Sequence, residues 1–270
     1  MRKVEDIVEI RAVLVELLSE IKQICDEHGL KYFLAYGTLL GAVRHKGFIP
    51  WDDDLDIEMP RPDYEKFIEI YRSEKRENIL YEQKAYPDYL YSFAKLVKRG
   101  TKLVERGCDC GVEMGLYVDI FPVDALGDDV EEAKKHLKKT KLPIRLLMSY
   151  RMDFYRPHVS WKRNLLVQAA KIIAPLYGKK RLIRTLEKRA FRFDYDTSKY
   201  VGSFISEINM RRIFEKKVYE ERIELEFEGK LFAAPKAYDE VLKKQYGDYM
   251  TLPPEDQRVL THGYDAYIED

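Results

Sequence analysis

Three carboxylates alternate along one short apolar segment of this chain. Asp54, Asp56 and Glu58 stand at positions i, i+2 and i+4, with Leu, Ile and Met between and after them. If residues 54–59 form a strand, the three carboxylates share one face. Carboxylates this close repel one another unless they reach solvent, take up protons or bind a cation. The spacing therefore predicts a site for a hard cation such as Mg²⁺, with a solvated acidic edge strand as the simpler alternative.

A glycine-threonine turn precedes these carboxylates. Residues 32–36 are typical of a short strand, and a short helix is expected over about residues 38–45. Gly37 and Thr38 would then lie at the start of that helix, where backbone N–H groups, a hydroxyl and the positive end of the helix dipole can bind a phosphate. A phosphate site followed by Asp-x-Asp on a strand indicates metal-assisted phosphate chemistry.

The segment 116–124 supplies a third carboxylate. Its alternation places Asp119 with Tyr117 and Phe121 on one face of a predicted strand. An ionisable group in so apolar a run is costly to bury without a partner, so we expect Asp119 to face the same cation. A salt bridge at the end of a buried strand is the alternative. Asp124 is interpreted as a loop or helix-capping residue.

These blocks resemble one protein family. They are GTLLGAVRH (37–45), GFIPWDDDLD (47–56), VDIFP (118–122), YGDYM (246–250), LPPE (252–255), HG (262–263) and DAY (265–267). Together they closely resemble the LicD family of phosphocholine transferases, which includes fukutin-related proteins. The similarity covers about residues 30–125 and 225–268.

The resemblance implies a nucleotidyltransferase-like fold in which Asp54, Asp56 and Asp119 hold Mg²⁺. It also implies transfer of phosphocholine, or a related phosphoalcohol, from a CDP-activated donor to a hydroxyl of a glycan or teichoic-acid precursor, with release of CMP. Asp119 is expected to orient or deprotonate that hydroxyl. Three alternatives remain: transfer of NMP from an NTP with release of pyrophosphate, a non-catalytic membrane or polymer scaffold, and a plain α+β binding module.

Further residues are expected to contact the donor. Lys95 lies in a predicted strand over 91–97 and would bind a phosphate or the nucleotide, unless it is a solvated strand lysine. Arg44 and His45 would hold the departing diphosphate, or only complement the helix dipole. His262 is assigned to the substrate site by its place in the family blocks.

Aromatic residues cluster in the sequence around the predicted metal site. They are Tyr36, Trp51, Tyr117 and Phe121. Such rings can cage a quaternary ammonium such as choline, or stack on a sugar or base. Their alternative role is ordinary core packing. Among them, Trp51 and Tyr117 are taken as candidate substrate contacts.

The remaining elements position this site. Apolar residues recur at helical spacing over 6–27, before His28-Gly29, and a second helix is expected over 63–73. The mixed order of elements favours an α+β fold, with a mixed sheet flanked by helices. We predict a catalytic core with its N-terminal helix at 1–133, a basic helical insertion at 134–194, and a part that completes the catalytic domain at 195–270.

Composition and charge limit the partners. The 270 residues are 46% hydrophobic and include three cysteines, and neither an apolar run near 18 residues nor a signal pattern is present. We therefore expect reduced thiols and a cytoplasmic protein, peripheral at the inner face of the membrane if it meets a membrane at all. The chain is neutral overall, yet residues 134–192 contain 18 Lys and Arg against two acids, a local balance of +16.

This basic region predicts a polyanionic partner, although no nucleic-acid-binding motif accompanies it and no nucleic acid is expected. It includes an amphipathic helix that should end near Pro175, with apolar residues at helical spacing flanked by basic ones. The helix either packs its apolar side on the core, as ordinary surface helices do, or docks on an anionic membrane face or a phosphate-rich, lipid-linked acceptor.

Overall fold

The computed structural model describes residues 1–269 apart from 106–108, 153–160, 204–209 and 260–262. The helices are α1 (Ile7–His28), α2 (Tyr36–His45), α3 (Arg61–Ser73), α4 (Val130–Ser149), α5 (Trp161–Tyr177), α6 (Lys179–Ala190) and α7 (Tyr238–Tyr246). The strands are β1 (Arg2–Val4), β2 (Phe33–Leu34), β3 (Asp56–Pro60), β4 (Ile79–Tyr81), β5 (Ala94–Val97), β6 (Thr101–Glu105), β7 (Tyr117–Gly127), β8 (Tyr200–Gly202), β9 (Phe214–Glu215), β10 (Arg222–Phe227), β11 (Lys230–Pro235) and β12 (Tyr264–Ile268). The predicted α+β class is confirmed.

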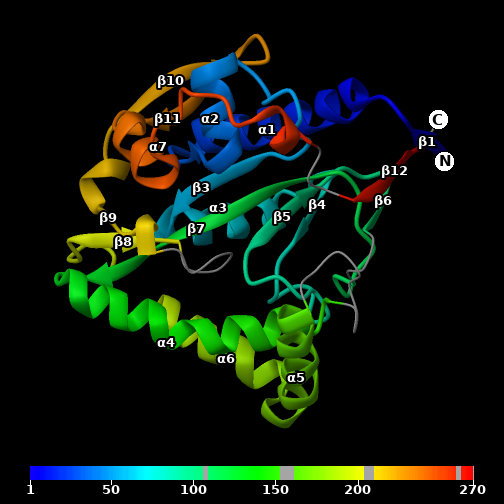
Figure 1. Cartoon of the computed structure of the whole chain (residues 1–270). Coiled ribbons are helices and arrows are strands. Elements are labelled where there is room, and N and C mark those ends of the chain that lie inside the picture. Colours follow the sequence, from blue (N-terminus) through cyan, green and yellow to red (C-terminus); the bar gives the residue numbers. More distant parts are fainter. Residues whose placement is uncertain (106–108, 153–160, 204–209, 260–262, 270) are drawn as a thin grey trace.

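A mixed sheet forms the centre of the molecule, in the strand order β2-β3-β7-β5-β4, with β8 added to β7 and β9 to β8. Strands β3 and β7 run parallel, whereas the other pairs of this sheet are antiparallel. A smaller sheet, β1-β12-β6, brings the two ends of the chain together (Figure 1). Strands β10 and β11 form a separate hairpin.

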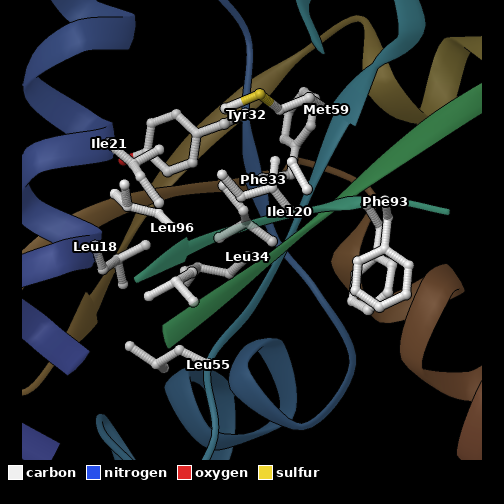
Figure 2. Close-up of a cluster of buried hydrophobic side chains, with 14 of the residues drawn as sticks. Leu18, Ile21, Tyr32, Phe33, Leu34, Leu55, Met59, Phe93, Leu96 and Ile120 are labelled. Carbon is white, nitrogen blue, oxygen red and sulfur yellow. The ribbon is translucent and has the colours of Figure 1, made fainter. Parts of the chain in front are cut away.

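The apolar face of the central sheet packs against α1. Leu18 and Ile21 project from this helix into a buried cluster with Leu34, Leu96 and Ile120 (Figure 2). The helix begins at an Asp6 side chain that accepts a hydrogen bond from the N–H of Val8 and ends at Gly29 in the left-handed conformation, with φ 66°. The helix predicted over 6–27 is therefore confirmed.

Several element boundaries differ from the predicted ones. Strand β3 begins at Asp56, so Asp54 precedes the strand in an irregular segment instead of opening it. Helix α2 begins two residues earlier than expected, at Tyr36, whose φ is 47°. Strand β5 starts only at Ala94. Each difference lies at an element end, where propensity is weakest and tertiary contacts decide.

Helices α4, α5 and α6 form a group on one side of the central sheet (Figure 1). Helix α4 follows β7 and packs on it, and α5 and α6 pack on α4. Leu146, Ala174 and Leu182 join the three helices in a small apolar cluster of their own. Helix α5 continues through Pro175 to Tyr177, past its predicted end, and Gly178 separates it from α6. The division of the chain into three parts stays a prediction.

Among the described residues, no helix has both the length and the apolarity needed to cross a bilayer.

Candidate functional site

Two of the predicted carboxylates lie side by side on neighbouring strands. Asp56 of β3 and Asp119 of β7 are register partners in the parallel ladder, and Lys95 of β5 is the antiparallel partner of Asp119. Register partners project from the same face of a sheet, so the three charged side chains form a row across three strands. This row lies on the face opposite Leu96 and Ile120, the residues that pack toward α1.

Lys95 is deeply buried, with 1% of its surface exposed, and its ammonium forms an ion pair with Asp119 Oδ1. The ring centroids of Tyr117 and Tyr91 lie 3.4 and 4.5 Å from Lys95 Nζ. The alternative of a solvated strand lysine is therefore wrong. Tyr117, considered for a choline cage, contacts this internal cation, and Phe121 packs edge to face on Tyr36 with ring centroids 5.2 Å apart.

Burial and mutual repulsion act on the acid groups. Burial raises the pKa of Asp56 well above its ordinary value, and the charges of Asp54 and Asp119 raise it further. The pKa of Asp119 is also raised by burial, although the charge of Lys95 opposes that shift. Asp54 thus belongs to the same electrostatic cluster, although it stands in the loop before β3. A cation at this row would relieve the repulsion.

The glycine-threonine turn supports Asp56 directly. The N–H of Asp56 donates a hydrogen bond to Thr38 Oγ1 at 2.8 Å, which fixes the start of β3 against the first turn of α2. A Cβ atom added to Gly37 would lie 2.7 Å from Asp52 Oδ2. A side chain at position 37 would therefore displace the Asp52 carboxylate, whose negative charge lies near the positive end of the helix dipole.

Two residues that sequence reasoning missed hold the loop between Gly47 and Asp54. The guanidinium Nη2 of Arg11 donates to the carbonyl oxygens of Ile49, Pro50 and Asp52 at 3.0, 2.9 and 2.7 Å. The hydroxyl of Tyr264 donates to the carbonyl of Asp53 at 3.3 Å. Arg11 is a basic residue beside the apolar stripe of its helix. Such residues are common in surface helices, so the sequence gives no sign that Arg11 holds this loop.

Arg44 and His45 bind each other at the end of α2. Arg44 Nε donates to His45 Nε2 at 2.9 Å, and Arg44 Nη1 donates to the carbonyl of Tyr249 at 2.9 Å. The pKa of His45 is lowered by burial and by the charge of Arg44, so its ring is neutral at pH 7 and can accept this hydrogen bond.

Trp51 lies near Arg258, whose guanidinium carbon is 5.8 Å from the ring centroid. His262 lies outside the described residues.

Glu58 shares the face of Asp56, as the alternation predicts, but it is already neutralised. It forms a buried ion pair with Arg212 and accepts a hydrogen bond of 2.9 Å from the hydroxyl of Tyr219. The Arg212 guanidinium also lies over the ring of Tyr36, 3.7 Å from its centroid. Because its charge is balanced by Arg212, Glu58 adds no net negative charge to the row of Asp56 and Asp119.

Asp124 is neither a loop residue nor a helix cap, so that interpretation is wrong. It lies within β7, is completely buried, and accepts a hydrogen bond of 2.6 Å from Arg61 Nε. The strand continues through Pro122, which pairs with Met59. A buried carboxylate requires such a cationic partner, which indicates a structural role for this pair.

Within the part of the chain that the structure describes, no group of three or more His, Cys, Asp and Glu side chains is arranged so that it could hold a metal ion by itself. The arrangement is instead a carboxylate pair, Asp56 and Asp119, with Lys95 next to Asp119 and the charge of Asp54 acting on both carboxylates. Beside Asp54, a small cavity is lined by Asp53, Tyr117 and Tyr264 among others. Such a partial donor set can bind Mg²⁺ when a ligand supplies further oxygens.

The chain is similar to proteins of known sequence. The chain is 29% identical over 266 residues to the lipopolysaccharide cholinephosphotransferase LicD of Haemophilus influenzae, covering 96% of this chain and 97% of that protein. Two uncharacterized proteins match shorter stretches. The protein of Rickettsia typhi is 44% identical over 57 residues, which are 21% of this chain and 18% of that protein. The protein of Rickettsia prowazekii is 46% identical over 50 residues, which are 18% of this chain and 19% of that protein.

Residues 29–169 match the family model described as LicD/FKTN/FKRP, nucleotidyltransferase domain. This range contains the Gly37-Thr38 turn and the Asp56, Asp119 and Lys95 row. The predicted family resemblance is confirmed, and the chain belongs to the LicD family.

Proposed function

We propose that this protein transfers phosphocholine, or a related phosphoalcohol, from a CDP-activated donor to a hydroxyl of a cell-surface glycan or teichoic-acid precursor, with release of CMP. The observation that carries the proposal is the row of Asp56, Asp119 and Lys95 on one face of the sheet, with Asp54 beside it. The relative named a lipopolysaccharide cholinephosphotransferase, which aligns along almost the whole chain, supports both the transferred group and a glycan acceptor.

The carboxylates fit Mg²⁺, the proposed cofactor. Their oxygens are the ligands that this ion prefers. The pKa of Asp56 is raised first by burial and then by repulsion from Asp54 and Asp119, and a bound cation would relieve that repulsion. Asp54, Asp56 and Asp119 are the candidate ligands. Mg²⁺ commonly binds one or two carboxylates together with substrate phosphates, which explains why the protein alone offers a partial set. When bound, the ion would neutralise charge on the diphosphate.

The protein's own groups have distinct roles in this mechanism. Thr38 holds the backbone of Asp56, and Lys95 fixes the carboxylate of Asp119. The second oxygen of Asp119 is the proposed acceptor for the proton of the attacking hydroxyl, because Lys95 engages the other oxygen. The hydroxyl oxygen then bonds to the phosphorus next to choline as the bond from that phosphorus to the CMP oxygen breaks.

A donor panel tests the proposal. The purified protein with Mg²⁺ and a lipopolysaccharide or teichoic-acid precursor as acceptor is incubated with CDP-choline, CDP-ribitol, CDP-glycerol or each of four NTPs, and CMP and pyrophosphate are measured. CMP from a CDP-alcohol is the expected product. Pyrophosphate from an NTP would instead favour nucleotidyl transfer, and no turnover of any donor would favour a non-catalytic scaffold.

A further inference from the structure

Helix α5 turns its apolar side away from the protein. Its large hydrophobic residues are exposed by 42 to 81%; they are Trp161, Leu165, Leu166, Ile172, Ile173, Leu176 and Tyr177. We call these seven residues the outer face of α5. The prediction that this helix packs its apolar side on the core, as most amphipathic surface helices do, is therefore wrong.

The outer face is continuous along the helix. Positions 161, 165, 172 and 176 follow the i, i+4, i+11, i+15 spacing of one row, and 166, 173 and 177 form the adjacent row. On the opposite side of the helix, Ala174 is 1% exposed and joins Leu146 of α4 and Leu182 of α6 in an apolar cluster, and Asn164 is 5% exposed. A contiguous apolar surface of this kind on a soluble domain marks an interaction site.

The surroundings of the outer face are strongly basic. Helix α6 carries six Lys and Arg against one acid, and exposed Lys180, Arg181 and Arg184 follow the C-terminal end of α5. Helix α5 itself contains no acidic residue. The net charge of residues 134–192 is +16. A partner that binds both these charges and the outer face of α5 must therefore offer negative charge and an apolar interior.

We propose that the outer face of α5 docks on an anionic lipid bilayer, with the helix lying in the plane of the interface. A bilayer offers headgroup phosphates to the basic residues and acyl chains to the apolar ones. A second copy of this chain fits poorly, because it would bring two strongly positive segments together. Trp161 and Tyr177 stand at the two ends of the helix, and their ring types favour the membrane interface.

The position of α5 suits such docking. In Figure 1 the helix lies at the edge of the molecule, and α4 connects this group of helices directly to β7, the strand that carries Asp119. A protein held through α5 would keep its charged row close to a membrane-borne acceptor. The docking surface goes beyond the proposed reaction, because lipid binding can be measured without donor or acceptor.

Vesicle sedimentation tests the docking surface. Wild-type protein is mixed with vesicles of phosphatidylcholine alone or with 30% phosphatidylglycerol, at low and high salt. The triple variant Leu166→Ser, Ile172→Ser, Leu176→Ser removes exposed apolar side chains. A control variant, Val8→Ser, Leu231→Ser, Val259→Ser, changes residues of similar exposure elsewhere. Circular dichroism and thermal melting check that both variants are folded.

We expect wild-type and control proteins to bind the anionic vesicles at low salt, and the α5 variant to bind at least tenfold more weakly. High salt should also weaken the binding of the wild-type protein at least tenfold. The reason is that the Debye length shortens from about 10 Å at 0.1 M salt to about 3 Å at 1 M. A Trp51→Phe variant leaves Trp161 as the sole tryptophan, so its emission should shift to the blue on binding. No wild-type binding at low salt, or equal binding by the α5 variant, overturns the proposal. So does a dimer in sedimentation equilibrium that the α5 variant abolishes, because a second copy would then cover this face.

Discussion

Lys95 and Asp119 stand opposite each other on antiparallel strands and form an ion pair in which the lysine is almost completely buried. Three aromatic rings, of Tyr91, Phe93 and Tyr117, lie within 5.3 Å of the lysine Nζ. The protein thus places a fixed cation of its own beside the carboxylates proposed to hold Mg²⁺. This pairing gives Asp119 one engaged oxygen and one that can serve the reaction.

Removing that fixed cation should destabilise the fold. Lys95→Met leaves Asp119 buried beside other carboxylates without its partner, which should lower the free energy of unfolding by about 3–5 kcal/mol. Urea denaturation measures the change. The double variant Lys95→Met, Asp119→Leu should recover most of it, because no unpaired charge remains. Lys98→Met, which breaks a more exposed pair with Glu16, serves as the control and should cost about 1 kcal/mol or less. A fully stable Lys95→Met single variant would contradict this account.

Asp54→Asn and Asp56→Asn should each abolish transfer while the fold stays intact. Each change removes a negative charge from the proposed metal site but almost no volume. The loss of transition-state stabilisation should be about 3 kcal/mol or more, which lowers kcat at least a hundredfold. Asp88→Asn, at a side chain 90% exposed, is the matched control and should retain activity. Near wild-type turnover by either site variant would mean that these carboxylates do not hold the ion.

Stability without Mg²⁺ should depend on pH through Asp56. Its pKa is raised in the folded protein by burial and then by Asp54 and Asp119, so the folded state keeps a proton that the unfolded chain releases near pH 4. The free energy of unfolding should therefore fall as the pH rises from about 4 through the raised pKa. Asp56→Asn should flatten this slope and raise stability at pH 7 in EDTA. Identical pH profiles for the two proteins in urea denaturation would rule out this linkage.

Much of this site could be predicted from local pattern. The alternation at Asp54 and Asp56, the apolar run around Asp119 and the Gly37-Thr38 turn all depend on neighbours in the sequence, and Asp56 and Asp119 indeed meet. Whether a carboxylate is free or neutralised depends on residues far away. Glu58 is paired with Arg212, 154 residues along the chain, and no periodicity could reveal that contact.

Contacts between residues far apart in the sequence also explain the other differences between the predictions and the structure. Asp124 was misinterpreted because the pattern around Pro122 resembles the end of a strand, whereas the ladder with β3 continues through it. The spacing in α5 correctly indicates an amphipathic helix, but periodicity cannot tell which side faces the protein. That direction is set by packing on α4 and α6, where Ala174 of α5 joins Leu146 and Leu182.

Donor and Mg²⁺ should bind together. The protein offers only part of a coordination shell, and the diphosphate supplies the remaining oxygens. Isothermal titration with CDP-choline should give at least tenfold tighter binding with Mg²⁺ than with EDTA, and Asp56→Asn should remove most of that gain. Equally tight binding in EDTA would count against a shared metal site.

The proposed transfer can be followed through the phosphorus next to choline. CDP-choline labelled at that phosphorus is incubated with Mg²⁺, a lipopolysaccharide or teichoic-acid precursor, and either wild-type protein or Asp56→Asn. We expect the label to move to the acceptor together with choline, in amounts equal to the CMP released, and only with the wild-type protein. Label that stays in CDP-choline while NTPs yield pyrophosphate, or equal transfer by Asp56→Asn, would contradict it.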